Sequence, residues 1–391
     1  MTGAVFSDRT SHLKPEGAYQ VLRRAGELEA AGRQIIHFEI GQPDFDTPDN
    51  IRLAGVQAIQ AGKTRYTPPA GMTSLQEAIA ADCSRRMNLP ISRDEVVVGP
   101  GAKPALFFPI LALVRPGDEV IYPDPGFPTY EAMIRVAGGT PVAVPLLEEN
   151  GFSFDLQAFD RKINAHTRLV ILNSPGNPTG GVIPRADLEH IAAQVQAHDC
   201  WVMSDEIYGH LAYDGLQVPS IYTLPGMPER TILVDGFSKT YAMTGWRLGY
   251  GIMPATLARR VELLLTHSVG STAEFTQFAG LEALQGPQEK VADMLAEYQQ
   301  RRDVIVAGLN DLPGVTCRKP QGAFYAFPNI RGTGLSSDQA ADLILEKGGV
   351  ALLPGSAFGA HGEGYLRLSY ATSLENIERG LEAIQRVLQG R

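Results

Sequence analysis

The sequence predicts an α/β protein in which a mainly parallel sheet lies between helices, accompanied by a smaller α+β domain. Three observations support this prediction. Short apolar runs rich in β-branched residues alternate with helical stretches from about residue 94 to residue 255, which is typical of parallel strands that are buried on both faces. After Ala255 the helical pattern dominates. The 391 residues also exceed what one hydrophobic core usually serves.

The N-terminal part is expected to form a helix and then a short strand. Residues 13–32 are amphipathic, and Gly32 suits the position that follows a helix. The apolar run 35–38 predicts a strand, and a turn of sequence GQPD begins at Gly41.

The central part is expected to supply the sheet. The predicted strands are residues 95–98, 120–122, 169–172, 200–205, 231–235 and 248–252. The helices predicted between them are residues 102–113, 129–136 and 187–197.

The C-terminal part is expected to be the α+β domain. Its predicted helices are residues 290–309, 337–345 and a final helix from Leu374, and its predicted strands are 323–327, 350–353 and 365–369. Because no Ser/Gly-rich linker interrupts the chain, we expect a helix to join the two domains.

Composition and charge argue against several classes of protein. Lys and Arg total 34 against 43 Asp and Glu, which gives a formal net charge of −9, and an acidic chain without a basic run is not expected to bind nucleic acid. We expect neither a transmembrane helix nor a signal peptide, because no apolar stretch of the required length or flanks occurs. The three widely spaced cysteines argue against a disulfide framework, and the absence of a zinc motif argues against a metal site. We therefore expect a cytoplasmic enzyme.

Lys239 stands in an unusual setting. It follows the predicted strand 231–235 in the segment DGFSKTYAMTGWR, among small and hydroxyl residues. A lysine that is shielded from water there would have a lowered pKa and a free amine for Schiff-base chemistry. Arg247, eight residues further on, suits a phosphate because its guanidinium binds two oxygens at once. This segment alone leaves open a lysine on a surface loop.

Polar residues also follow three other predicted strands. Asn177 lies in the turn NSPGNPTG, Asp205 and Tyr208 in the segment SDEIY, and Gly101 in the strand-to-helix turn GPGAKP. The carboxyl ends of strands are where open α/β sheets bind ligands, and a helix N-terminus favours phosphate. Taken singly, these segments also fit an ordinary turn and a helix cap. The turn at Gly101 matches neither the dinucleotide fingerprint nor the P-loop, which disfavours a dehydrogenase.

Six segments together resemble pyridoxal-phosphate (PLP) enzymes of fold type I, and among them the class I/II aminotransferases, in particular the bacterial aspartate and aromatic aminotransferases. The resemblance runs in the family's order from about Lys14 to the C-terminus. The segments are GQPDFDTP (41–48), KTRYTPPAG (63–71), NSPGNPTG (173–180), SDEIY (204–208), GFSKTYAMTGWRLGY (236–250) and YLRLSYA (365–371). The resemblance implies a large PLP-binding domain at 45–285 with a mainly parallel seven-stranded sheet. A smaller α+β domain would comprise residues 286–391 together with the N-terminal segment 1–44.

The resemblance also implies how these residues would bind the cofactor. Lys239 resembles the lysine that joins PLP covalently and then acts as acid and base, and Asp205 the aspartate that keeps the pyridine nitrogen protonated. Tyr208 and Asn177 would donate hydrogen bonds to the phenolic oxygen, and Phe127 would stack on the ring. The phosphate would contact the N–H groups of Gly101, Ala102 and Lys103, the side chains of Ser238 and Arg247, and Tyr66 of the neighbouring subunit. A homodimer with shared active sites follows from the role of Tyr66. Gly236 stands where many relatives have a serine, so one phosphate contact is expected to be lost or moved to Ser238.

Arg367 resembles the arginine that binds the substrate α-carboxylate, supported by Asn177 and the backbone of Gly41. Lys103 matches the lysine that binds a distal carboxylate in the aspartate aminotransferases of this subgroup. Glu16, which follows the Lys-Pro step at 14–15, would oppose a second carboxylate if it faced the pocket. We therefore predict that aspartate is accepted without being strongly preferred over neutral or aromatic amino acids.

The resemblance implies transfer of an amino group between an L-amino acid and a 2-oxo acid by ping-pong chemistry, with glutamate and 2-oxoglutarate as one couple. A PLP-dependent C–S (β) lyase is the alternative, because the same lysine chemistry can expel a β-substituent. A non-enzymatic regulator with a PLP fold is less expected, because such proteins usually carry a helix-turn-helix domain, for which there is no room before Lys14.

Overall fold

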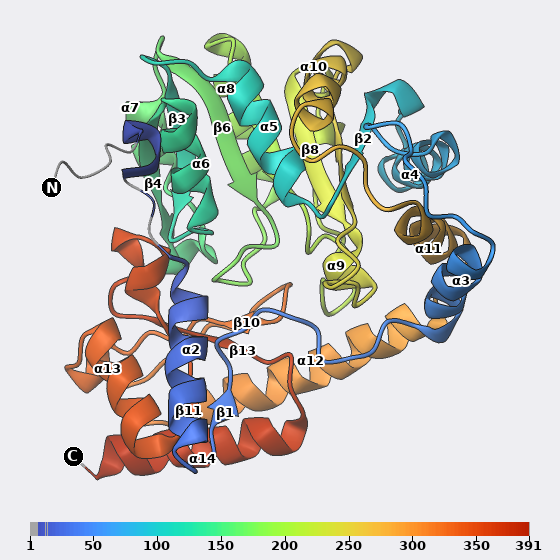
Figure 1. The fold of residues 1–391 in the computed structure, drawn as a ribbon. Helices are drawn as coiled ribbons and strands as arrows, with labels where there is room; N and C mark the ends of the chain where they lie inside the picture. The colour runs from blue at the N-terminus through green and yellow to red at the C-terminus, as the bar shows by residue number, and fades with distance from the viewer. Residues whose placement is uncertain (1–6, 12, 14, 391) are drawn as a thin grey trace, which may run out of the picture.

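The computed structural model describes residues 7–11, 13 and 15–390. A sheet of eight strands lies at the centre of the larger of its two parts (Figure 1). Its strands in spatial order are β2 (Val96–Gly99), β9 (Gly249–Ile252), β8 (Thr231–Gly236), β7 (Trp201–Asp205), β6 (Thr167–Asn173), β3 (Glu119–Asp124), β4 (Thr140–Leu147) and β5 (Ser153–Phe154). The neighbours from β8 through β7, β6 and β3 to β4 are parallel. The pairings of β2 with β9, β9 with β8 and β4 with β5 are antiparallel. The predicted α/β fold class is therefore confirmed.

The sheet has eight strands where seven were expected, and all six strands predicted residue by residue for the central part are present. β4 was not predicted, because Pro141 and Pro145 argue against a strand in the middle of a sheet. Most of β4 pairs only with β3, since β5 reaches no further than Leu146 and Leu147. The prolines are therefore tolerated on a strand that is an edge for most of its length.

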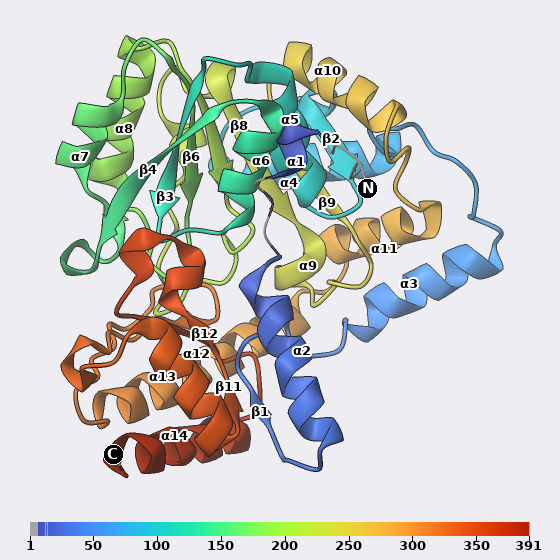
Figure 2. The same ribbon diagram turned by 60° about the vertical axis from the view of Figure 1, so that its left-hand side comes forward.

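Helices cover both faces of the sheet (Figures 1 and 2). Along β6, Leu169 and Ile171 enter one hydrophobic core, while Val170 and Leu172 enter the core on the opposite face, because successive side chains of a strand alternate. The first core includes α5 (Lys103–Leu113), α6 (Thr129–Ala137) and α10 (Ala255–Thr266). The second includes α7 (Leu156–Lys162) and α8 (Arg185–Ala197), and a third core lies against α4 (Thr73–Met87) and α11 (Glu274–Gln285). The short α1 (Asp8–Ser11) contacts α6, and α3 (Asp49–Gln60) packs on α11.

The smaller part combines the N-terminal segment with about the last quarter of the chain around a separate hydrophobic core. Its elements are α2 (Gly17–Ala30), β1 (Ile36–His37), α12 (Glu289–Asn310), β10 (Tyr325–Ala326), α13 (Ser337–Leu343), β11 (Val350–Ala351), β12 (Leu353–Pro354), β13 (Leu366–Ser369) and α14 (Leu374–Gln389). β1 pairs with β11, and β13 lies between β10 and β12. In Figure 1, α12 extends from beside α11 into this part. The domain boundaries at 44/45 and 285/286 stay predictions.

Element boundaries differ from the prediction mainly in the small part. α2 begins at Gly17 rather than at residue 13, and Lys14 lies outside the described residues. The expected strand 350–353 is divided into β11 and β12, and α13 continues as a π-helical turn at Ile344–Gly348. The helices α3, α4 and α7 were not predicted. No helix in the described part of the chain is long and apolar enough to cross a membrane.

Candidate active site

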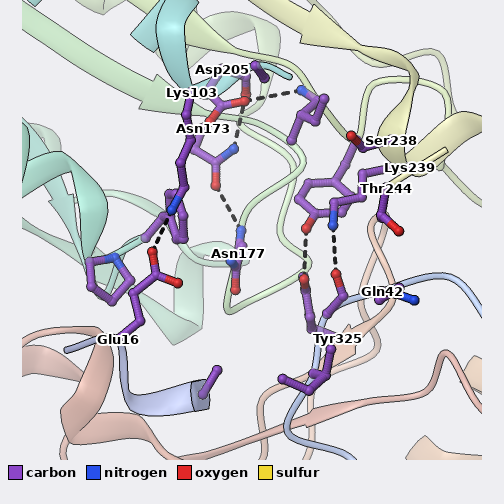
Figure 3. A pocket seen from close by; sticks show the side chains of 18 of the residues that line it. Glu16, Gln42, Lys103, Asn173, Asn177, Asp205, Ser238, Lys239, Thr244 and Tyr325 are labelled. Carbon is purple, nitrogen blue, oxygen red and sulfur yellow. Dashed lines mark hydrogen bonds and ion pairs between the residues drawn. The ribbon is translucent and has the colours of Figure 1, made fainter. Parts of the chain in front are cut away.

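The carboxyl ends of three neighbouring parallel strands open into one cavity. Asn173 ends β6, Asp205 ends β7, and the short helix α9 (Phe237–Thr240), which carries Lys239, follows β8 directly. The cavity has a volume of about 670 Å³ and is closed on its other side by residues of the smaller part (Figure 3). Its position is the one at which open α/β sheets bind ligands. All predicted site residues except Gly101 and Tyr66 line it: Gly41, Ala102, Lys103, Phe127, Asn177, Asp205, Tyr208, Ser238, Lys239, Arg247 and Arg367.

The amine of Lys239 faces this cavity and is held by the backbone. Its Nζ donates a hydrogen bond of 2.6 Å to the carbonyl oxygen of Gly41 (Figure 3). Loss of surrounding water lowers the pKa of Lys239 to about 8, and the positive charges of Arg367 and Arg247 act in the same direction. The alternative of a lysine on a surface loop is therefore excluded. A substantial fraction of neutral amine near pH 8 makes Lys239 a competent nucleophile and base.

Asp205 is buried at the end of β7 beneath the same cavity. The hydroxyl of Tyr130 donates a 2.6 Å hydrogen bond to its Oδ2, and the backbone N–H of Ile207 donates to Oδ1 at 3.2 Å. Burial raises the pKa of Asp205 to about 6, although both hydrogen bonds act in the opposite direction. The carboxylate is therefore poised to bind a cation that enters the cavity. Tyr130 was not predicted, and only its place three residues after Phe127 could have suggested it.

Arg367 on β13 reaches the cavity from the smaller part. Its Nη1 donates to Oδ1 of Asn177 at 3.2 Å, and its Nη2 donates to the carbonyl oxygen of Glu39. Its Nε is buried and has no hydrogen-bond partner within the described residues. Buried polar groups rarely stay unpaired, so the arrangement favours an anionic ligand at this guanidinium.

The predicted phosphate-binding groups other than Tyr66 lie together at the start of α5. Gly101 has a φ of +84°, and a Cβ there would collide with the guanidinium of Arg247. The backbone conformation therefore favours glycine, and a side chain there would also displace the guanidinium of Arg247. Ser238 and Ala102 line the adjacent wall. Unpaired N–H groups at a helix start, combined with an arginine, suit a phosphate.

Glu16, the N-cap residue of α2, faces the cavity and pairs with Lys103. Its Oε1 accepts a hydrogen bond from Lys103 Nζ at 2.7 Å (Figure 3) and another from Thr129 Oγ1 at 3.0 Å. The Lys103 amine also lies 5.5 Å from the ring centroid of Phe127. The condition on which the prediction for aspartate depended, that Glu16 points into the pocket, is thus met. Tyr66 lies elsewhere and is 99% exposed.

The residues present fit PLP. A buried carboxylate faces the site where a pyridine nitrogen could bind, a lysine of lowered pKa lies beside it, and a glycine turn with an arginine offers a place for a phosphate. The unpaired Nε of Arg367 leaves a further anion site for an amino-acid carboxylate.

Comparison with known proteins agrees with this geometry. The pattern of the family described as Aminotransferase class I and II matches residues 33–384. The chain belongs to this family. It is 39% identical to the aspartate aminotransferase of Pyrococcus horikoshii over 98% of this chain and 97% of that one. It is 36% identical to aromatic-amino-acid aminotransferase 2 of Thermococcus litoralis over 98% of both chains. The solved structure of the aspartate aminotransferase of Thermus thermophilus with maleate superposes with a TM-score of 0.93, at 38% identity over 98% of this chain and 100% of that one.

The enzyme is therefore an aminotransferase of PLP fold type I, and it depends on PLP as this family does. The predicted family, enzyme class and cofactor are confirmed. The family and these relatives do not favour the C–S lyase alternative.

Proposed function

We propose that this aminotransferase moves an amino group between an L-amino acid and a 2-oxo acid by a ping-pong reaction, with glutamate and 2-oxoglutarate as one couple. The observation that carries the proposal is that the amine of Lys239 and the guanidinium of Arg367 face the same cavity. An amino acid bound there through its carboxylate presents its Cα to a base. The test mixes the PLP-loaded enzyme with one amino acid and no acceptor. It should release one 2-oxo acid per active site and then stop, whereas a lyase would continue to release ammonia and pyruvate.

The chain's own residues would have distinct tasks in this reaction. PLP, when bound, supplies the electron sink that makes the proton on Cα acidic. Lys239 would then carry that proton away from Cα and deliver a proton to C4′ of the cofactor. Asp205, held by Tyr130, would keep a proton on the pyridine nitrogen. Arg367 would hold the α-carboxylate in place.

Further residues would orient the cofactor. Tyr208 and Asn177 would donate hydrogen bonds to its phenolic oxygen, and Phe127 would pack against its ring. The N–H groups of Gly101, Ala102 and Lys103 would bind the phosphate together with Ser238 and Arg247. Gly236 offers no hydroxyl for this purpose, so Ser238 would be the serine that contacts the phosphate.

We also propose that two copies of the chain form a homodimer. Leu53, Val56 and Ile59 recur along α3 and are 55%, 48% and 51% exposed, and Tyr66 beyond them is 99% exposed. An exposed apolar stripe of this kind is typical of an interface.

The molar mass of the holoenzyme from sedimentation should be that of a dimer. Tyr66→Phe should weaken PLP binding about tenfold by removing one hydrogen bond to a charged group. A monomeric holoenzyme would contradict the proposal.

We propose that the enzyme accepts amino acids with neutral or aromatic side chains as readily as those with acidic side chains. Lys103 offers a positive charge, but the carboxylate of Glu16 lies 2.7 Å from it, so little net attraction remains for a second carboxylate. Glu16→Ser should therefore raise kcat/KM for aspartate relative to phenylalanine about fivefold, as expected for a half-exposed pair. The change should lie mostly in KM, as measured by steady-state rates with 2-oxoglutarate.

A matched control is Glu189→Ser, which breaks the exposed pair of Glu189 with Arg185 on α8. Its aspartate-to-phenylalanine ratio should equal that of the wild type. If Glu16→Ser also left the ratio unchanged, the Glu16–Lys103 pair would have no part in selectivity.

A further inference from the structure

Tyr325 on β10 is buried and contacts both Tyr208 and Arg367, to which the proposed function gives different roles. Its hydroxyl lies 2.7 Å from the hydroxyl of Tyr208 (Figure 3). Its ring lies under Arg367, whose guanidinium carbon is 4.6 Å from the ring centroid. A Cβ at Gly41 would collide with the Tyr325 hydroxyl, so the backbone that accepts the hydrogen bond from Lys239 packs directly against this side chain. Sequence patterns gave no reason to select Tyr325.

The hydrogen bond between the two tyrosines has a direction. Each hydroxyl carries one proton, and burial raises the pKa of both phenols, so both are neutral in the working range of pH. If the proton of Tyr208 is donated to the phenolic oxygen of PLP, the Tyr208 oxygen must accept the proton of Tyr325. In the opposite arrangement Tyr208 would have no proton left for the cofactor.

The ring of Tyr325 packs against the guanidinium of Arg367. The guanidinium carbon of Arg367 contacts the ring of Tyr325 and also that of Phe358, whose centroid is 5.0 Å away. Two cation–π contacts restrict the orientation of the guanidinium. This restriction matters because two parallel hydrogen bonds to a carboxylate require a defined orientation.

We propose that Tyr325 is a positioning residue, whose hydroxyl donates to Tyr208 and so directs the Tyr208 proton to the cofactor, and whose ring holds Arg367 in the plane that binds the substrate carboxylate. This inference rests on the roles proposed above for Tyr208 and Arg367. It assigns the two effects to different atoms of one side chain, so that they can be separated.

Two variants of the PLP-loaded enzyme separate them. Tyr325→Phe removes the hydroxyl and keeps the ring, whereas Tyr325→Leu removes both. The first readout is the pH at which the visible absorption band of the bound cofactor changes. Both variants should raise this pH by about 10–30% of the shift seen in Tyr208→Phe, because a donor strengthens the next hydrogen bond by that fraction. The second readout is KM for the amino acid, which should stay unchanged in Tyr325→Phe and rise about tenfold in Tyr325→Leu.

The control is Tyr370→Phe, which removes a hydroxyl from another buried pair, that of Tyr370 with Tyr213 at 3.3 Å, away from the cavity. It should change neither readout. An unchanged or lowered transition in Tyr325→Phe would overturn the donor role, and equal KM values in the two Tyr325 variants would overturn the role of the ring. If Tyr325→Leu did not fold, Tyr325→Met would replace it.

The reference variant distinguishes failure of this inference from failure of the proposed function. A shift in Tyr208→Phe without one in Tyr325→Phe overturns only the donor role of Tyr325. No shift in Tyr208→Phe overturns the role of Tyr208 and the donor role of Tyr325 with it. Release of a 2-oxo acid by the wild-type enzyme tests the amino-group transfer independently of both.

Discussion

Lys239→Ala is expected to abolish the covalent link to PLP and to lower turnover by at least about 10⁴-fold, because the variant loses both the attachment point and the acid–base group. The structure gives the physical reason, since the Lys239 amine faces the cavity with its pKa lowered to about 8. The purified wild type should be yellow, and borohydride should fix PLP to Lys239, as mass spectrometry of the peptides can verify.

Lys103→Ala is the matched control, because Lys103 lines the same cavity. It should retain the borohydride-reducible link. Recovery of a reduced PLP adduct on another lysine of the Lys239→Ala protein would refute the assignment.

The pH dependence of PLP capture provides a check on the wild type. A lowered lysine pKa means that the amine is protonated and unreactive below about pH 8 and free above it. The rate at which the apoprotein links PLP should therefore rise with pH and level off above about 8. A rate that kept rising toward the ordinary lysine range of about 10.4 would contradict the lowered pKa.

Asp205→Asn should leave the fold intact and largely retain PLP, but it should reduce turnover on the order of 10²–10³-fold, the usual cost of losing one preorganised electrostatic partner. A neutral amide cannot hold a proton on the pyridine nitrogen, so the electron sink is weakened. Single-turnover rates with a saturating amino acid measure this step without interference from product release.

Glu206→Gln is the matched control for Asp205→Asn. Glu206 is the adjacent buried carboxyl group, but it accepts hydrogen bonds from Ser204 and Ser220 and does not line the cavity. This variant should keep most of its turnover. Near wild-type turnover in Asp205→Asn would show that the carboxylate is dispensable.

The sequence predicted best those features that depend on local pattern. The strand that ends at Asp205 and the turn that carries Asn177 were recognisable, because apolar runs and turn residues are local signals, and the resemblance placed Lys239 and Arg367 in one site. Tyr130 and Tyr325 were missed, because they reach the site through contacts between segments far apart in the chain. The β4 strand was missed because its two prolines are acceptable only at an edge, which depends on the neighbouring strand.

The two parts of the fold contribute different kinds of residue to the cavity. Asp205 ends a strand of the large sheet and Tyr208 and Lys239 follow such strands, whereas Arg367 and Tyr325 lie on strands of the smaller part. If Glu16, which precedes α2 in the smaller part, sets the side-chain preference through its pair with Lys103 as proposed, substitutions at Glu16 change which substrates are selected while the strands of the large sheet still position the groups proposed to bind the cofactor. Such a separation lets the specificity of one scaffold diverge during evolution without loss of its chemistry, and relatives named for aspartate and for aromatic amino acids are consistent with that history.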